Sequence, residues 1–189
     1  MTIIGLTGPT GAGKSELYRV AETYGFQVID CDKTARKASL PGTKGLTALT
    51  EVFGKDILFP DGTLNRKTLA KKAFASPENT ELLNRTLLPF IRLELEKEMT
   101  GEKVLLDAPT LFESGADTLC RCTVAVLADP DIRKQRIMAR DNLTEEEAVL
   151  RMNAGKPDDF YRKKADYIII NNGQMADYFK AFAQIIESL

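Results

Sequence analysis

A glycine-rich segment near the N-terminus constrains this chain more than any other part of its sequence. The segment Gly8-Pro9-Thr10-Gly11-Ala12-Gly13-Lys14-Ser15 matches the phosphate-binding pattern G-x-x-x-x-G-K-[ST] without a gap. Its glycines let successive backbone N–H groups turn into one concavity that suits an anion. Lys14 adds a positive charge for the β- and γ-phosphates of a nucleotide, and Ser15 adds a hydroxyl for Mg²⁺. The predicted ATP-binding residues are therefore Gly11, Ala12, Gly13, Lys14, Ser15 and Glu16.

The elements expected on either side of this segment support the match. Residues 2–6 are largely apolar and β-branched, which predicts a buried strand, and residues 16–24 are predicted to form a helix that ends near Gly25. A strand, a glycine loop and a helix thus follow in the order that a phosphate site requires. The helix would turn the positive end of its dipole toward the phosphates. An ordinary glycine-rich turn that carries a lysine by chance is the disfavoured alternative.

Strands alternate with helices along the rest of the chain, which predicts an α/β fold with a five-stranded parallel sheet and helices on both faces. The second strand, residues 26–30, is expected beside the phosphate-loop strand. Residues 40–100 carry little strand signal and predict a helical insertion, whose last long helix is expected to break at Pro89. Residues 155–159 are expected as a loop. The further strands are predicted at residues 104–107, 123–127 and 167–170.

Composition excludes several classes of protein. The 189 residues include 43% hydrophobic and 28% charged side chains, with a net charge of −1 and no histidine. A near-neutral charge argues against dependence on nucleic acid, and no apolar run approaches the roughly 20 residues of a membrane helix. No secretory signal is recognised, so a cytoplasmic protein with reduced cysteines is expected. Without histidine, acid–base or charge-stabilising roles fall to carboxylates, lysines and arginines.

Aspartates follow two of the predicted strands. Asp30 and Asp32 come at or just past the carboxyl end of the second strand, the edge where open α/β sheets bind ligands. Asp32 is a candidate catalytic carboxylate, although it could equally cap the helix predicted at residues 33–39. Asp107 ends the third strand and fits the loose form of a motif whose carboxylate helps hold Mg²⁺ through water. A turn or cap is the alternative for Asp107.

Three arginines recur on the helix predicted to run from Asp129 through residue 139. Arg133, Arg136 and Arg140 are spaced three and four residues apart and share one face. They could clamp the charge of a transferring phosphoryl group, or form a solvated basic face. A capping box at Thr144 starts a further helix, and the segment of about residues 140–160 could close over a nucleotide as a lid.

Several sequence blocks together resemble the dephospho-CoA kinase family, in the family's order and over nearly the whole chain. Besides the phosphate loop, they are Val28-Ile29-Asp30-Cys31-Asp32, Pro41-Gly42-Thr43, Phe59-Pro60-Asp61-Gly62-Thr63-Leu64, Asp107-Ala108-Pro109-Thr110-Leu111-Phe112-Glu113, Met138-Ala139-Arg140-Asp141 and Ala165-Asp166-Tyr167. The resemblance implies a P-loop kinase fold in a single chain. Its core would take about residues 1–39, 101–139 and 165–189, its substrate-binding insertion about 40–100, and its lid about 140–160.

The same resemblance implies an activity. ATP would donate its γ-phosphoryl, with Mg²⁺, to the 3′-hydroxyl of dephospho-CoA, in the last step of coenzyme A synthesis. Asp32 matches the family's proposed base and Arg140 its lid arginine. With Lys14 they form the expected catalytic set, while Asp32, Asp107 and Arg136 are the expected substrate-binding residues and Ser15 the metal ligand. The small-molecule substrate is the expected partner; oligomeric state is left open.

Four positions depart from the family pattern. Pro9 and Glu16 stand where a glycine and a threonine are usual, and Leu88 and Gly155 where a histidine and a glutamine are usual. Two alternatives therefore stay open: a P-loop kinase for another nucleoside or nucleotide, and a relative that binds ATP only to regulate or scaffold. A GTPase-type switch would need an Asn-Lys-x-Asp segment, which the sequence lacks.

Overall fold

The computed structural model describes residues 1–189 and divides into two compact units. The first unit comprises residues 1–29, 101–112 and 116–189, and the second comprises residues 30–100 and 113–115. Residues 30–39, expected as part of the core, group with the helical unit because helix α2 (Cys31–Lys37) packs on helix α5 (Pro77–Glu98). None of the helices combines the length and the apolar character that a membrane span requires.

The first unit is built on the five-stranded parallel sheet that the alternation of elements predicts. Its strands are β1 (Thr2–Thr7), β2 (Gln27–Asp30), β3 (Lys103–Asp107), β4 (Cys122–Leu127) and β5 (Tyr167–Ile170), in the spatial order β2-β3-β1-β4-β5. The prediction that the second strand lies beside the first is wrong, because β3 lies between them. The half-buried strand β2 takes an edge, whereas the apolar strands β1 and β4 are buried in the interior of the sheet.

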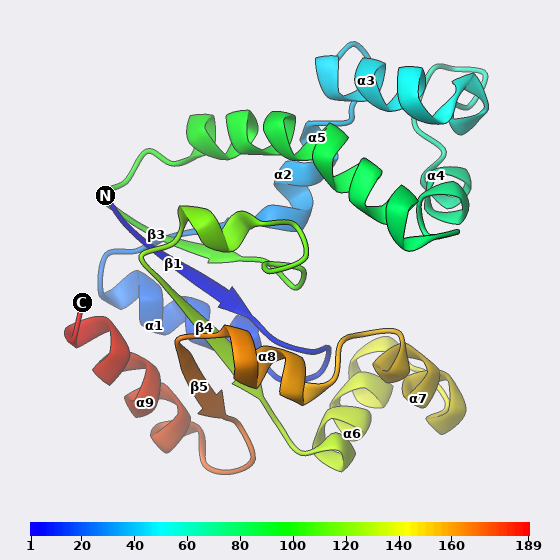
Figure 1. The fold of residues 1–189 in the computed structure, drawn as a ribbon. Helices are drawn as coiled ribbons and strands as arrows, with labels where there is room; N and C mark the ends of the chain where they lie inside the picture. The colour runs from blue at the N-terminus through cyan, green and yellow to red at the C-terminus, as the bar shows by residue number, and fades with distance from the viewer. The chain divides into compact units, whose positions relative to one another are not determined.

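Helices and loops cover both faces of this sheet (Figure 1). Side chains alternate between the faces of a strand, so Ile4 and Leu6 point one way and Gly5 the other. Ile4 and Leu6 belong to a buried cluster with α1 (Leu17–Thr23) and α9 (Met175–Glu187). A side chain at Gly5 would meet Leu111 and Cys120 on the opposite face. Both faces are therefore closed to water, as a parallel sheet requires.

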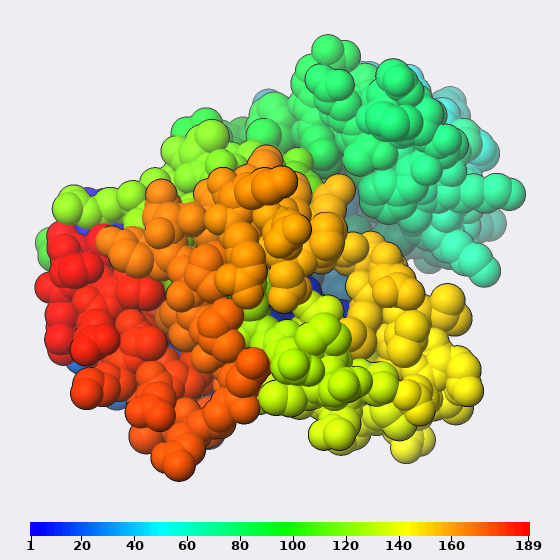
Figure 2. All heavy atoms as spheres, turned by 60° about the horizontal axis from the view of Figure 1, so that its bottom comes forward, coloured from blue at the N-terminus to red at the C-terminus, as the bar shows by residue number.

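Three more helices of the first unit follow β4. They are α6 (Pro130–Asp141), α7 (Glu145–Asn153) and α8 (Asp158–Lys164), and α6 and α7 pack against each other (Figures 1 and 2). The predicted capping box at Thr144 is confirmed at the start of α7. The expected loop at residues 155–159 is shorter than predicted, because α8 begins at Asp158 and places two acidic residues in its first turn, where the helix dipole favours them.

The second unit is mainly helical and contains one isolated antiparallel bridge, between Leu58 and Leu64. Besides α2 and α5 it contains α3 (Lys44–Phe53), α4 (Arg66–Ala73) and one 3-10 turn (Lys55–Ile57). Its core joins Leu49, Phe53, Ile57, Leu69 and Ala73. The predicted caps Asn65 and Ser76 are confirmed. The predicted interruption at Pro89 is wrong, because α5 continues through it, although the two halves of α5 run in different directions in Figure 1. Pro89 has no N–H group, so the carbonyl of Arg85, four residues earlier, lacks its helical hydrogen bond. Both residues are exposed, so water can bond to this carbonyl instead.

Candidate active site

The phosphate loop connects β1 to α1 and has the backbone that its glycines predict. Gly8, Gly11 and Gly13 have φ angles of 139°, 80° and 91°, in the region that side chains disfavour. A Cβ atom at Gly8 would collide with the carbonyl oxygen of Val126, and one at Gly13 with the side-chain amide of Asn171. Both glycines are therefore required by close packing as well as by torsion.

Side chains from three distant elements hold the carbonyl oxygens of this loop. The Asn171 amide donates to Ala12 O at 2.8 Å, and the Tyr178 hydroxyl donates to Gly13 O at 2.9 Å. The Arg136 guanidinium donates to Ala12 O at 3.3 Å and to Asn171 O at 3.1 Å. Burial raises the pKa of Tyr178, which keeps its phenol protonated as a donor. The Ala12 N–H donates within the loop, to Pro9 O at 3.2 Å. Because carbonyls of the loop are bound from the protein side, other N–H groups of the arc can face an anion.

Lys14 and Ser15 follow the glycines at the start of the helical segment. The Lys14 Nζ atom lies 3.4 Å from Gly8 O, so the side chain folds back over its own loop. Ser15 is exposed, which leaves its hydroxyl accessible. The positive end of the helical segment and the ammonium group of Lys14 thus come together at one loop, the arrangement that binds phosphate.

Asp107 is the last residue of β3, and it pairs in register with Leu6 of β1, the strand that leads into the phosphate loop. Its carboxylate accepts a hydrogen bond from the Tyr18 hydroxyl of α1. The carboxylate of Asp107 and the hydroxyl of Ser15 are hard oxygen donors of the kind that Mg²⁺ prefers, and Mg²⁺ commonly binds through one or two protein oxygens, waters and substrate phosphates. The residues present at this edge of the sheet therefore fit a magnesium ion.

The three arginines of α6 go to different partners. Arg133 is 7% exposed and forms an ion pair with Asp158 at 2.9 Å, which attaches α8 to α6. Arg136 contacts the phosphate loop, as described above. Arg140 makes two hydrogen bonds to Asp141, at 2.9 and 2.8 Å, and these raise the pKa of Arg140. Of the three guanidinium groups, only that of Arg136 hydrogen-bonds to the loop, whereas Arg133 approaches Gly11 with its backbone.

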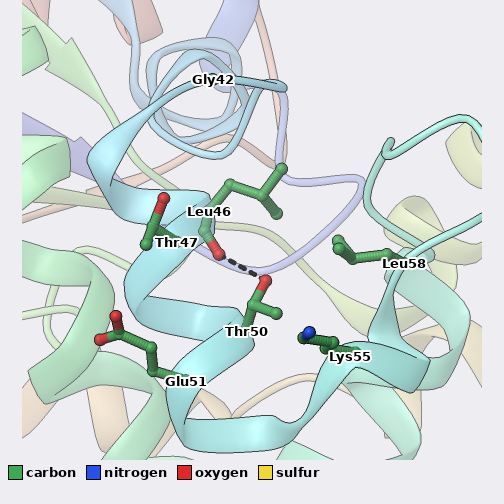
Figure 3. A pocket seen from close by; sticks show the side chains of 7 residues that line it. All are labelled: Gly42, Leu46, Thr47, Thr50, Glu51, Lys55 and Leu58. Carbon is green, nitrogen blue, oxygen red and sulfur yellow. Dashed lines mark hydrogen bonds between the residues drawn. The ribbon is translucent and has the colours of Figure 1, made fainter.

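The second unit contains a cavity of about 380 Å³ that sequence reasoning did not find (Figure 3). Its apolar lining includes Leu46 of α3 and Leu58, with Lys55 and Glu51 as charged residues of the wall. The remaining lining residues are Gly42, Thr47 and Thr50. The Thr50 hydroxyl donates to Leu46 O at 2.8 Å, so it presents its methyl group rather than a free donor. The cavity can accept a slender, mainly apolar group.

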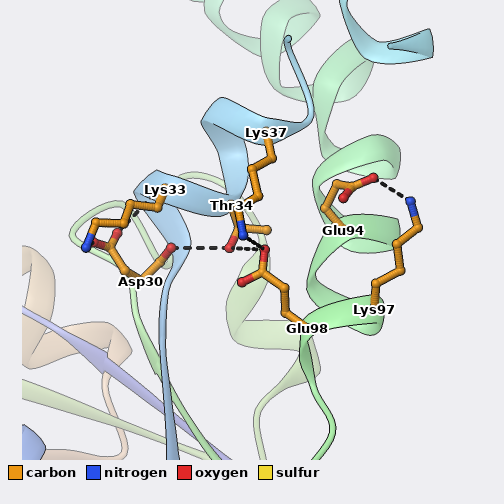
Figure 4. A network of polar contacts seen from close by, with 7 residues as sticks. All are labelled: Asp30, Lys33, Thr34, Lys37, Glu94, Lys97 and Glu98. Carbon is orange, nitrogen blue, oxygen red and sulfur yellow. Dashed lines mark hydrogen bonds and ion pairs between the residues drawn. The ribbon is translucent and has the colours of Figure 1, made fainter.

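Asp30 and Asp32 have separate roles in the second unit. Asp30, not Asp32, caps α2, because its carboxylate accepts from the Lys33 N–H at 3.0 Å (Figure 4). Burial alone would raise the pKa of Asp30, but the hydrogen bonds and charge of Lys33 outweigh it and lower the pKa. The Asp32 side chain is exposed in the first turn and makes no hydrogen bond or ion pair. The capping alternative for Asp32 is therefore wrong.

The sequence did not indicate that Asn171 and Tyr178 would bind the carbonyl oxygens of the phosphate loop. Asn171 had a weak signal, since it directly follows the buried strand β5 at the sheet edge where ligands bind. Tyr178 had none, because a tyrosine on an amphipathic helix is usually a core residue. Their role is visible only in the contacts with residues 12 and 13.

The parallel sheet, its glycine loop and the lysine and serine that follow define the class of P-loop kinases. Within this class, the chain belongs to the dephospho-CoA kinase family, since the family model described by that name matches residues 2–177. The resemblance found in the sequence blocks is thus confirmed, and with it the identification as an ATP-dependent kinase.

Known proteins of similar length support this assignment. A dephospho-CoA kinase of Corynebacterium glutamicum is 40% identical, over 100% of this chain and 98% of its own. A solved structure from Thermus thermophilus is 31% identical with a TM-score of 0.80, covering 100% of this chain and 97% of its own. The dephospho-CoA kinase structure from Campylobacter jejuni is 28% identical with a TM-score of 0.62, covering 98% and 96%.

Proposed function

We propose that this protein transfers the γ-phosphoryl group of ATP to the 3′-hydroxyl of dephospho-CoA, giving coenzyme A and ADP. The observation that carries the proposal is the phosphate loop, with its carbonyls bound by Asn171, Tyr178 and Arg136, in a chain matched by the dephospho-CoA kinase model over residues 2–177. The cavity of the helical unit, lined by apolar, hydroxyl and charged side chains, offers room for part of the acceptor. A cytoplasmic location belongs to the same proposal.

Each residue has a defined part in the reaction. The loop N–H groups and Lys14 bind and orient the phosphates, while Ser15 and Asp107 would hold Mg²⁺. When bound, the ion neutralises charge on the β- and γ-phosphate oxygens. The acceptor oxygen forms a bond to the γ-phosphorus, the bond to the bridging oxygen of ADP breaks, and the acceptor proton passes to the Asp32 carboxylate. Arg140 stabilises the charge that develops on the transferring group.

The test is an ADP-release assay with ATP and purified protein. ADP should form in proportion to dephospho-CoA, and EDTA should stop its formation. Lys14→Ala should remove most of the turnover without unfolding the protein, because this side chain contacts the loop and not the core. Turnover only with AMP or nucleosides would identify a different kinase, and ATP binding with no acceptor-dependent ADP would identify a regulatory relative.

A further inference from the structure

Arg36 and Arg66 are two of the three arginines of the helical unit that have no carboxylate partner; the third is Arg85. Arg36 lies in the last turn of α2, and Arg66 is the first residue of α4. Neither forms an ion pair, whereas several other basic side chains of the same unit do. Those paired side chains are Lys33, Lys37, Lys72, Arg92 and Lys97. What distinguishes Arg36 and Arg66 from other unpaired cations of this unit is their connection through Ser39.

A buried serine orients the Arg66 guanidinium. Ser39 is 2% exposed, and its Oγ atom accepts from Arg66 Nη2 at 3.0 Å. The same Oγ atom lies within donor distance of two carbonyl oxygens at the end of α2, Arg36 O at 3.2 Å and Ala35 O at 3.4 Å. The hydroxyl thus connects Arg66 to the end of α2 that carries Arg36. The pKa of Arg66 is lowered, mainly by burial and to a smaller extent by the positive charge of Arg36.

Two neighbouring guanidinium groups without a counterion repel each other, and an anion between them would relieve this repulsion. Phosphate is the anion that their planar donor forks fit best, since two N–H groups can bind two of its oxygens. Cations near a helix C-terminus can also simply stabilise the helix dipole, which is the competing explanation for Arg36. The two explanations differ in what the loss of Arg36 should do to stability.

Asp32 lies four residues before Arg36 on α2, so the two side chains share a helix face about one turn, or about 6 Å, apart. In dephospho-CoA, the 3′-hydroxyl and the 5′-diphosphate are attached to the same ribose, only a few bonds apart. A base for the hydroxyl and a site for the diphosphate should therefore be similarly close.

We propose that Arg36 and Arg66 form the binding site for the 5′-diphosphate of the acceptor, and that the site presents the ribose 3′-hydroxyl to Asp32. This inference rests on the proposed function. The pair differs from the phosphate loop, which offers backbone N–H groups and one lysine, so ATP and acceptor each have their own anion site.

The experiment measures the Kd of dephospho-CoA by calorimetry on protein saturated with Mg²⁺ and a non-hydrolysable ATP analogue, which occupies the phosphate loop. Arg36→Gln and Arg66→Gln should each weaken acceptor binding by about 10- to 100-fold, the usual value of a charged hydrogen bond. The KM for ATP should stay within about twofold. Arg92→Gln, an exposed arginine of the same unit paired with Glu96, is the matched control and should bind dephospho-CoA as the wild type does.

Stability separates binding from a structural role. Without ligand, Arg36→Gln should unfold at the same temperature as the wild type or higher, since it removes a like-charge repulsion. A lowered unfolding temperature with unchanged acceptor affinity would instead show that Arg36 serves the helix, and would overturn the proposal. If wild type turns over dephospho-CoA and both variants bind it normally, only the arginine site is wrong. If wild type neither binds nor phosphorylates dephospho-CoA, the proposed function fails, and this site with it.

Discussion

At the scale of single residues, position relative to a helix end decides what each carboxylate can do. Asp30 and Asp32 are two residues apart, yet Asp30 is occupied with the N–H of Lys33 while Asp32 has no partner. A general base must be free to accept a proton from its substrate. The absence of a structural task for Asp32 therefore supports its assignment as the base.

Asp32→Asn should lower turnover by about 10²- to 10⁴-fold, the usual contribution of a positioned acid–base group, because the amide cannot accept the proton. Affinity for both substrates and the unfolding temperature should change little, since the side chain is exposed and unpaired. Steady-state kinetics, calorimetry and thermal unfolding check these points. Turnover within a few-fold of the wild type, with both substrates bound, would exclude Asp32 as the base.

Tyr178→Phe should weaken ATP binding while leaving the ring packed in the core. The lost hydrogen bond to Gly13 O is worth about 0.5–1.5 kcal/mol, which corresponds to about a 2- to 10-fold rise in the Kd of ATP. Tyr24→Phe is the control, because it also removes a tyrosine hydrogen bond, to Glu187, but away from the loop. Equal nucleotide affinities in both variants would show that Tyr178 only fills space.

At the scale of elements, α2 is the helix that carries both Asp32 and Arg36, and it is held at several points. Asp30 caps its first turn, and Thr34 and Lys37 both donate to Glu98 of α5 at 3.1 Å (Figure 4). Thr34 is fully buried at this contact. These bonds restrict the rotation of α2, and so they determine which of its side chains face the solvent.

Asp30→Ala should destabilise the helical unit by about 1 kcal/mol through loss of the cap. The same cap should weaken in acid, because the pKa of Asp30 is lowered in the folded state. Its contribution to the free energy of unfolding is complete above the unfolded pKa and is lost as the pH falls through the folded pKa. Urea unfolding at pH 7 and pH 3 measures both effects. The difference between wild type and Asp30→Ala should shrink at pH 3; an equal difference at both pH values would contradict a charged cap.

At the scale of the whole molecule, the core of the first unit controls the chemistry of its cysteines. Burial raises the pKa of Cys120 to about 12 and that of Cys122 to about 11. Only the thiolate is nucleophilic, and each unit by which the pKa exceeds the pH lowers its fraction about tenfold. Neither thiol is therefore suited to a reactive role at neutral pH.

Iodoacetamide at pH 8 should modify Cys120 and Cys122 in the native protein at about a hundredth or less of the rate in urea, because both pKa values are raised and Cys122 is also buried. Because the folded protein favours the protonated thiols, they contribute fully to the free energy of unfolding below the unfolded thiol pKa of about 8.5. This contribution is lost as the pH rises through the folded pKa values of about 11 to 12. Mass spectrometry after timed alkylation, and unfolding at pH 8 to 11, measure these effects. Rapid native labelling of both residues would contradict the closed core.

The sequence by itself determined the features that depend on neighbouring residues. The phosphate loop follows from glycine torsions, and the caps at Asn65, Ser76 and Thr144 follow from side chains that bond a backbone N–H three residues on. The strands follow from short apolar runs, and their alternation with helices implies the parallel sheet. Local chemistry of this kind is readable without knowing where the rest of the chain lies.

Only the tertiary structure decided what distant residues do to one another. It put β3 between β1 and β2, continued α5 through Pro89, and divided the arginines of α6 among separate partners. It also brought Tyr178 to Gly13, 165 residues away in the chain. A local pattern leaves such outcomes open, because the free energy of a contact depends on the burial and hydrogen bonds that both partners gain when the whole chain packs.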